Sequence, residues 1–228
     1  MAKFPHILNE RLWFPDPREA VSIGPYEGIV AVGGDLSVER LLLAYRSGMF
    51  PWSGRPITWW SPDPRAVFEL ENFHIPRSLK RRLEEDSFQV TFNTAFEAVI
   101  DACAAPGPNR GTTWISPEIR EAYVALFKTG HAHSVEVWHE GALAGGVYGV
   151  ATRGLFAGES MFHRVSDASK VGLCHLVAHL KERDYALFDI QMVTPVTLQL
   201  GAKEISREDY LARLEKAVSI ERSFIGNP

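Results

Sequence analysis

Cysteine is scarce in this chain. Only Cys103 and Cys174 occur among 228 residues, and they stand in unrelated sequence contexts. So few and widely separated thiols exclude a disulfide-stapled scaffold and a cysteine-rich metal knuckle. We therefore expect both cysteines to be small buried apolar side chains in a reducing compartment.

Long apolar runs and a strong net charge are lacking as well. No stretch approaches the roughly 18 apolar residues that a membrane-spanning helix needs, and residues 1–6 lack a basic start followed by an apolar run. These absences predict a cytoplasmic protein without a membrane partner. The net charge is only −4, so a polyanionic partner would have to be recognised by a local basic cluster.

What the chain does contain is ordinary for a globular protein, with 46% apolar and 23% charged residues. Residues 1–65 are rich in proline, tryptophan and glycine, whereas helix and strand patterns alternate from residue 66 onward. A run of antiparallel strands followed by a helix and another strand fits a mixed sheet covered by helices. We predict the α+β class, with a small N-terminal α+β domain over residues 1–65 and a mixed-sheet domain over residues 66–228.

Capping signals locate several elements. Ser37 and Gly48 bracket a predicted helix over residues 38–47, and Ser116 opens one that ends at Gly130. Residues 59–65 read as a turn-rich crossing between the domains. Further helices are predicted over residues 94–104 (capped by Asn93), 169–183 and 207–218, and strands over residues 88–92, 134–138, 142–150, 155–162 and 186–193.

Two apolar, strand-like runs near the C-terminus carry polar groups. Asp189 and Gln191 are two apart, so a regular strand would project both from one face, and Glu159 interrupts the other run. Such groups are costly to bury unless they are paired or used. They could form ion pairs, with Lys170 or Arg164 as partners. Alternatively, they could serve acyl transfer to an amine, in which a carboxylate orients the amine and an amide stabilises the negative oxygen.

A basic stretch and exposed indoles suggest a nucleotide-bearing ligand. Arg77, Lys80 and Arg81 would lie on one side of a helix, as phosphate contacts require, although a solvated helix face is the alternative. Trp52 and Trp114 lie in turn-like sequence where an indole could stack on a nucleobase, and packing between domains is the alternative.

Other chemistry is disfavoured. His175 and His179 have the spacing of a zinc pair, but Leu176 stands where a zinc hydrolase motif needs glutamate. Ser160 lacks the second glycine of a nucleophile elbow, so a covalent intermediate is not expected. Gly145-Gly146 has no phosphate-loop context and is interpreted as a turn or a close backbone approach.

Seven motifs, in this order, resemble those of the leucyl/phenylalanyl-tRNA–protein transferase family. The resemblance runs from about residue 10 to about residue 218. The motifs are residues 50–52, 59–65, 111–115, 131–138, 145–149, 158–162 and 200–202.

The resemblance implies a C-terminal domain with an acetyltransferase-like (GNAT) core. It implies transfer of leucine or phenylalanine from tRNA to proteins that begin with arginine or lysine, which marks them for bacterial degradation by the N-end rule. The implied partners are leucyl-tRNA, phenylalanyl-tRNA and the acceptor proteins, with no metal and no organic cofactor. A monomer is the default expectation.

The resemblance also implies roles for individual residues. The ester and the incoming amine would meet Glu159, Asp189 and Gln191. The leucyl or phenylalanyl side chain would lie among Val147, Phe156, Met161, Leu180 and Phe188. The terminal adenosine would lie against Trp52 and Trp114, and the acceptor stem against Arg77, Lys80 and Arg81.

Two departures and two alternatives accompany this interpretation. The family often has methionine where Val147 stands, and commonly has histidine where Val196 stands. An acyl-CoA-dependent N-acetyltransferase is one alternative, but residues 163–170 contain no glycine for its pyrophosphate loop. A non-catalytic tRNA-binding adaptor is the other, and would be favoured if Asp189 and Gln191 lay far from the tryptophans.

Overall fold

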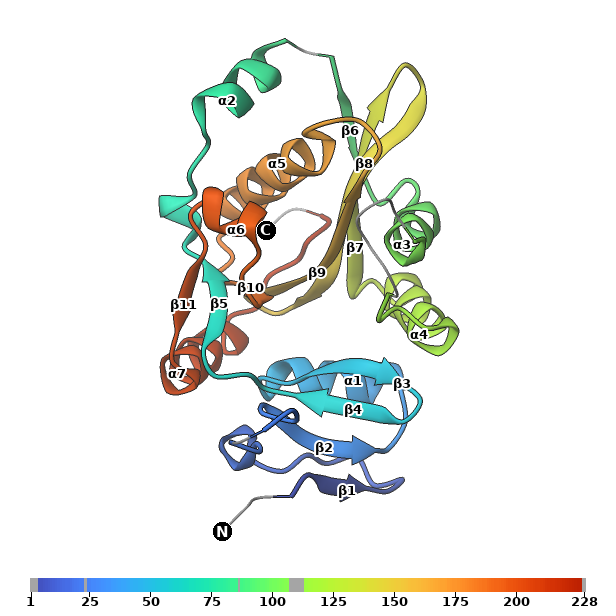
Figure 1. Ribbon diagram of the computed structural model, residues 1–228, viewed down its shortest axis with the longest axis vertical. Helices are drawn as coiled ribbons and strands as arrows, with labels where there is room; N and C mark the ends of the chain where they lie inside the picture. The colour runs from blue at the N-terminus through green and yellow to red at the C-terminus, as the bar shows by residue number, and fades with distance from the viewer. Residues whose placement is uncertain (1–3, 23, 86, 107–112, 227–228) are drawn as a thin grey trace.

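Two β-sheets organise the chain in a computed structural model that describes residues 4–22, 24–85, 87–106 and 113–226. Gly111 and Thr112, which belong to one of the quoted motifs, lie outside these residues. The first sheet is built from the N-terminal part of the chain and forms one end of the molecule (Figure 1). Its strand order is β1 (His6–Leu8), β2 (Ile29–Gly33), β4 (Ile57–Trp60), β3 (Phe50–Gly54).

The second sheet has seven strands and mixed direction. Its neighbouring strands are antiparallel except for the parallel pair β9 and β10. The predicted α+β class with a mixed sheet is therefore confirmed. The strand order is β11 (Lys203–Ile205), β5 (Arg65–Phe68), β10 (Leu187–Gln191), β9 (Leu155–His163), β8 (Ala142–Thr152), β7 (Ala132–His139), β6 (Gln89–Phe92).

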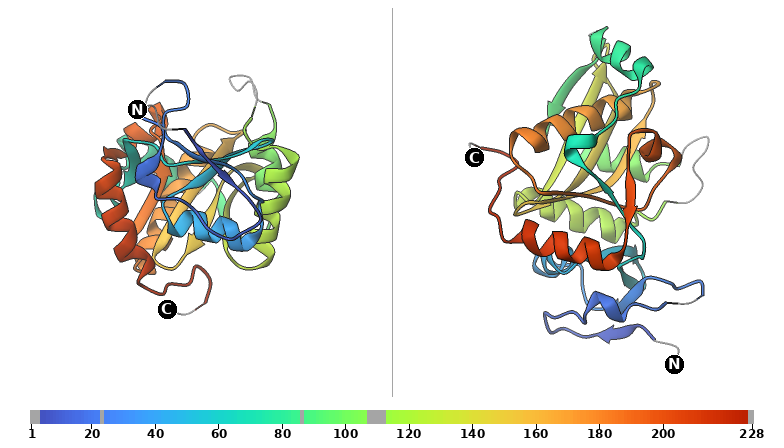
Figure 2. Two further views of the ribbon diagram at one scale, coloured as in Figure 1. Left: turned by 90° about the horizontal axis from the view of Figure 1, so that it is seen from below. Right: turned by 90° about the vertical axis from the view of Figure 1, so that its left-hand side faces the viewer.

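Helices cover both faces of the large sheet (Figures 1 and 2). The longest, α5, packs on one face, and α3 and α4 pack on the other. α1 and α7 lie where the two sheets meet, and α2 lies at the end of the molecule opposite the small sheet. The helices are α1 (Val38–Arg46), α2 (Arg77–Glu84), α3 (Phe96–Ala104), α4 (Pro117–Lys128), α5 (Ala168–Glu182), α6 (Pro195–Gln199) and α7 (Arg207–Val218), with 3-10 turns η1 (Pro17–Glu19) and η2 (Leu70–Asn72).

The change from one sheet to the other falls between Trp60 and Arg65. A single buried cluster nevertheless continues from Leu41 and Trp59 to Val99 and Tyr148. We propose that the domains divide at the predicted boundary near residue 65, where Arg65 already belongs to β5, and that the two sheets share part of their core. Within the described residues, no helix is long and apolar enough to cross a bilayer.

Most predicted helix ends agree with the structure. The Ser37 hydroxyl accepts a hydrogen bond from the Arg40 N–H at the start of α1, and the Ser116 hydroxyl accepts one from the Ile119 N–H at the start of α4. Gly48 follows α1 with φ +85°, a conformation that glycine adopts without strain. These helix ends depend on contacts between residues close together in the chain, so the sequence alone predicts them.

The predicted Asn93 cap is wrong. The Asn93 side chain accepts a hydrogen bond from the Ser134 N–H instead. The Thr94 and Ala95 N–H groups before α3 donate to the carboxylate of Glu136, which is fully buried on β7. A carboxylate from a distant strand therefore replaces the local cap.

Residues 59–65 are only partly the predicted turn-rich crossing. Trp59 belongs to β4, an inner strand of the small sheet, and its fully buried indole donates to the Gly33 carbonyl over 2.9 Å. By contrast, the expected close approach at Gly145 is confirmed. A Cβ atom there would lie 2.7 Å from the Ala168 Cβ, so only glycine lets β8 approach the start of α5.

Candidate active site

A β-bulge interrupts β10 at the polar residues. Against β5, Asp189 pairs with Val67 and Gln191 pairs with Ala66, so Ile190 is an extra residue without a partner of its own. Gln191 has φ +56°, a conformation that is uncommon outside glycine and often marks a functional position.

The bulge decides which side chains reach the cavity beside β10. Phe188, Ile190 and Gln191 line it, and Asp189 does not. A regular strand would have placed Gln191 on the face of Asp189. The prediction that the two share a face is therefore wrong, because one extra residue reverses the alternation.

Asp189 forms a buried ion pair with Arg65. The Arg65 Nε donates to Oδ1 over 2.9 Å and Nη2 to Oδ2 over 2.6 Å. The Tyr210 hydroxyl donates to Oδ2 and the Gln191 N–H to Oδ1, each over 2.9 Å. Four hydrogen bonds occupy the acceptor capacity of this fully buried carboxylate. Asp189 consequently holds the Gln191 backbone and has no lone pair directed at the cavity.

The predicted ion-pair partners of this carboxylate are wrong. Lys170 pairs with Asp167 over 2.8 Å, and Arg164 donates to the Leu143 carbonyl over 3.1 Å. The actual partner is Arg65, the first residue of β5, and β5 pairs with β10. Residue 65 ends one of the family motifs, so that motif was the available sequence signal.

Glu159, on β9, lies at the polar end of the cavity. It accepts hydrogen bonds from the Tyr45 hydroxyl over 2.8 Å, the Tyr123 hydroxyl over 2.9 Å and the Gln191 amide over 3.3 Å. Burial, opposed by the two tyrosine hydrogen bonds, raises the pKa of Glu159 to about 7.

A hydrogen count agrees with this raised pKa. The Tyr45 and Tyr123 hydroxyls also contact each other, so three contacts link the two hydroxyls and Glu159. Two hydroxyl hydrogens cannot fill three contacts. A protonated Glu159 would donate to one tyrosine oxygen, which leaves the hydrogen of that tyrosine for the other hydroxyl. Burial also raises the pKa of both tyrosines, which keeps them protonated.

The raised pKa of Glu159 predicts a pH-dependent stability. Between about pH 4.5 and 7 the folded protein keeps a proton that the unfolded chain releases, so the free energy of unfolding should fall as pH rises through this interval. We expect this contribution, on the order of 3 kcal/mol, to be present below pH 4.5 and lost above pH 7. Glu159→Gln should remove it, as measured by urea unfolding at pH 5 and pH 7.5.

The control for this measurement is Glu97→Gln, which changes an exposed carboxylate of α3 that pairs with Arg120. It should retain the pH dependence of the unaltered protein. An unchanged dependence in Glu159→Gln would contradict a shared proton at this site.

The cavity has a volume of about 220 Å³ and mostly apolar walls. Of the five predicted pocket residues, the structure brings Val147, Met161 and Phe188 to it. Phe156 and Leu180 are buried in the adjoining core and do not line it. The remaining lining residues are Phe68, Gly158, Glu159, Ser160, Leu173, Ile190, Gln191, Met192, Thr194 and Thr197.

Leu173 and Phe68 are cavity residues that the sequence interpretation missed. Leu173 lies on the face of α5 that packs against the sheet, and Phe68 ends β5, beside β10. The apolar periodicity of α5 was the available signal for Leu173. Gly158 keeps the cavity open on its β9 side, since a Cβ there would lie 3.0 Å from the Phe188 ring.

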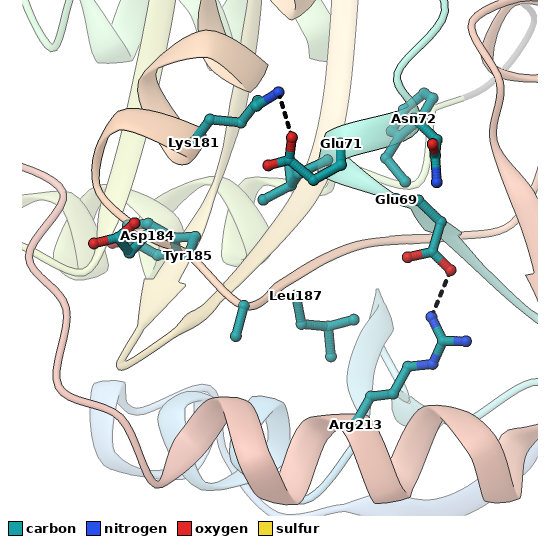
Figure 3. Close-up of a pocket in the computed structure, with 11 residues that line it drawn as sticks. Glu69, Glu71, Asn72, Lys181, Asp184, Tyr185, Leu187 and Arg213 are labelled. Carbon is teal, nitrogen blue, oxygen red and sulfur yellow. Dashed lines mark hydrogen bonds and ion pairs between the residues drawn. The ribbon is translucent and has the colours of Figure 1, made fainter.

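A second cavity, of about 330 Å³, lies between η2, α5 and α7 (Figure 3). Four of its charged side chains form two ion pairs, Glu69 with Arg213 over 2.7 Å and Glu71 with Lys181 over 2.8 Å. None of the predicted site residues lines it. The smaller, apolar cavity is therefore the better candidate for the site.

One of the two tryptophans predicted to stack, Trp114, lies close to Glu159. The Trp114 ring is 6.2 Å from that of Tyr123, whose hydroxyl donates to Glu159. Trp52, on β3, packs edge-on against Trp60 with ring centroids 5.0 Å apart. Because Gln191 also contacts Glu159, Trp114 is not remote from Gln191, which disfavours a tRNA-binding adaptor.

The basic residues lie elsewhere. Arg77, Lys80 and Arg81 are exposed on α2, which Leu79 anchors to the core. Arg81 lies 3.8 Å from Glu85. This helix is at the end of the molecule far from β3 (Figure 1), so a single ligand reaching both Trp52 and α2 would have to extend along the molecule.

No metal centre accompanies these residues. Among the described residues, no group of three or more histidine, cysteine, aspartate or glutamate side chains could hold a metal ion. His179, half of the histidine pair, instead lies 2.8 Å from the Phe224 carbonyl oxygen.

Solved structures that overlap this chain include a GCN5-related N-acetyltransferase from Kribbella flavida and the structure titled L-PGS from Bacillus licheniformis. The first has a TM-score of 0.40 at 12% identity, over 71% of this chain and 58% of that chain. The second has a TM-score of 0.41 at 15% identity, over 75% of this chain and 55% of that one.

Comparison with known sequences identifies the family of this chain. The family described as Leucyl/phenylalanyl-tRNA protein transferase matches residues 67–215, and its N-terminal domain matches residues 34–63. A protein named leucyl/phenylalanyl-tRNA–protein transferase from Azoarcus sp. (strain BH72) is 51% identical over 211 residues, which is 92% of this chain and 89% of that one. One from Oleidesulfovibrio alaskensis is 50% identical over 221 residues, which is 93% and 88% of the two chains. The chain therefore belongs to the leucyl/phenylalanyl-tRNA protein transferase family.

Proposed function

We propose that this protein transfers leucine or phenylalanine from aminoacyl-tRNA to the N-terminal α-amine of proteins that begin with arginine or lysine. Family membership supports this reaction. The structural observation that carries the proposal is the apolar cavity with Gln191 and Glu159 at one end. An aliphatic or aromatic side chain would fill the cavity, and its ester would meet the two polar groups.

In the proposed reaction the acceptor amine attacks the ester carbonyl carbon. A C–N bond forms, the C–O bond to the tRNA ribose breaks, and one amine proton ends on the ribose oxygen. An α-amine with an ordinary pKa of roughly 7.7–8.0 is partly neutral at pH 7, so no strong base is needed. The Gln191 amide would donate to the negative oxygen of the tetrahedral intermediate, and Glu159 would orient the amine.

We propose a positioning role for Asp189, one of the three residues that the resemblance places at the ester and the incoming amine. Its carboxylate is occupied by Arg65, Tyr210 and the Gln191 N–H. Through the last of these contacts it would hold the bulge that directs Gln191 into the cavity. Fixing the amide before the substrate arrives lowers the reorganisation needed in the transition state.

The tRNA would be held by stacking and by phosphate contacts. Trp52 and Trp114 would stack on the terminal adenosine, since both are only partly buried and Trp114 lies beside Tyr123. The exposed Arg77, Lys80 and Arg81 would contact the acceptor stem. We also propose a bacterial cytoplasmic location, a monomeric state, no metal or organic cofactor, and a product that enters the N-end rule degradation pathway.

Replacing Lys80 and Arg81 together by alanine should weaken tRNA binding. Each lost phosphate contact should also reduce the slope of log affinity against log salt by about one. Binding should be measured by titration at several salt concentrations. Lys203→Ala/Lys216→Ala removes the same charge from exposed positions on β11 and α7 and should leave the slope unchanged. Equal slopes for the two double variants would show that α2 is a solvated face that makes no phosphate contacts.

Three donor experiments test the proposed reaction. Incubation with labelled leucyl-tRNA and a peptide that begins with arginine should yield labelled peptide. Incubation with acetyl-CoA and the same peptide should yield no acetylated peptide. Acetyl transfer would instead support an N-acetyltransferase, and tRNA binding without transfer would support an adaptor.

A further inference from the structure

The segment after α7 returns to the large sheet and buries one aromatic ring. Phe224 is only 3% exposed. Its carbonyl oxygen lies 2.8 Å from His179 Nε2, and the Arg183 guanidinium donates to the Ser223 and Gly226 carbonyls. Phe224 lies outside the matched residues 67–215. The segment after α7 is therefore held by hydrogen bonds to α5 and to Arg183, the residue that follows α5.

The Phe224 ring is part of an aromatic stack. It lies nearly parallel to the His133 ring, with centroids 4.1 Å apart and an interplanar angle of 14°. On another side it stacks on Phe156, at 5.4 Å and 27°. The His179 ring lies 4.4 Å away. Such ring contacts stabilise a packed arrangement beyond the effect of the buried area alone.

Phe156 connects this stack to the candidate site. Its ring meets Phe188 edge-on, with centroids 5.6 Å apart, and Phe188 lines the cavity. A Cβ at Gly149 would lie 2.6 Å from the Phe156 ring, so the strand backbone confines that ring on another side. Phe156 therefore lies between the cavity wall and Phe224, without lining the cavity itself.

We propose that Phe224 is a positioning residue that sets the width of the aminoacyl cavity, and so the choice between leucyl and phenylalanyl donors. The proposal rests on the proposed transferase function. Protein interiors are close-packed, and removing a buried ring leaves a void that neighbours only partly fill. Without Phe224, Phe156 can move back and Phe188 can follow it. The widened cavity then favours the larger phenylalanyl side chain.

The test is the ratio of kcat/KM for phenylalanyl-tRNA to that for leucyl-tRNA. Phe224→Ala should raise this ratio about 3- to 10-fold, which is at or below the lower end of the roughly 10- to 200-fold effect of one methylene group in an apolar pocket, because Phe224 acts through Phe156. Phe188→Ala, in the cavity wall itself, is the positive control and should change the ratio too. Ile225→Ala alters the neighbouring side chain, which is 60% exposed, and should leave the ratio unchanged.

A general loss of stability would lower kcat/KM equally for the two donor tRNAs and leave their ratio unchanged. An unchanged ratio in a folded Phe224→Ala variant therefore overturns the proposal. Should that variant fail to fold, Phe224→Leu keeps most of the volume and should shift the ratio in the same direction by a smaller factor. The absence of any shift there overturns the proposal as well. If the unaltered protein uses neither donor, the proposed function itself fails, whereas normal transfer with a constant ratio rejects only the role of Phe224.

Discussion

Gln191→Ala is expected to lower kcat by about 10²–10³, with little change in affinity for aminoacyl-tRNA. This is the loss typical of removing one donor to a tetrahedral oxyanion, and such a donor acts mainly in the transition state. The Gln191 amide lies at the polar end of an apolar cavity, within 3.3 Å of Glu159. Single-turnover kinetics with saturating leucyl-tRNA would separate this effect from binding.

Backbone strain needs its own control, because residue 191 has φ +56°. Alanine is strained in this conformation and glycine is not. Gln191→Gly should therefore lose as much activity as Gln191→Ala if the amide is responsible. Recovery in the glycine variant, or only a tenfold loss in both, would count against the oxyanion role. Gln199→Ala changes an exposed glutamine on α6 and should behave as the unaltered protein.

Arg65→Met should lower the free energy of unfolding by about 3–5 kcal/mol, because it leaves the Asp189 carboxylate buried without its cation. The Arg65 side chain is 1% exposed and the Asp189 side chain 0%, so neither group can turn to water in place. We also expect turnover to fall about 100-fold, since a small displacement of Gln191 misaligns the reacting groups. Urea unfolding and transfer kinetics would measure the two effects.

A second variant separates stability from positioning. Arg65→Met/Asp189→Leu removes both charges and should recover much of the lost stability, because apolar replacement of a buried pair is often nearly neutral. Its turnover should stay low, since the Gln191 N–H loses its acceptor. Recovery of activity together with stability would contradict the positioning role. Arg213→Ala, which breaks a partly exposed pair with Glu69, should cost at most about 1 kcal/mol.

Local signals predicted much of the fold. Ser37 and Ser116 are short-range caps, and the helix predicted over residues 207–218 is α7 as observed. The apolar periodicity of the later strands and of α5 also gave their approximate bounds. The small sheet was not predicted in detail, because its short strands carry proline and glycine and are stabilised by pairing with distant strands.

The candidate site shows more clearly what the sequence could not predict. Sequence indicated Glu159, Asp189 and Gln191 as unusual polar residues, but it could not show that a bulge sends Gln191 and Asp189 to different faces. A bulge depends on the register against β5, which is a long-range property. The pairing of Asp189 with Arg65 likewise joins residues that are far apart in the chain.

The cavity walls show the same limit. Phe156 and Leu180 are apolar, as the pocket would require, yet they are buried behind the wall, and Leu173 occupies it instead. Which side of an apolar residue faces a cavity and which faces the core depends on packing among strands and helices. The aromatic stack around Phe224 forms in the same way, from segments that only the folded chain brings together.

The most direct test is to locate the transferred residue on the acceptor peptide. The purified protein would be incubated with leucyl-tRNA and a peptide that begins with arginine and contains an internal lysine, and the product sequenced by mass spectrometry. We predict one added leucine, in peptide linkage to the N-terminal α-amine, and its loss when that amine is acetylated beforehand. Leucine on the lysine side chain, or no transfer while leucyl-tRNA remains bound, would contradict the proposed reaction at Gln191 and Glu159.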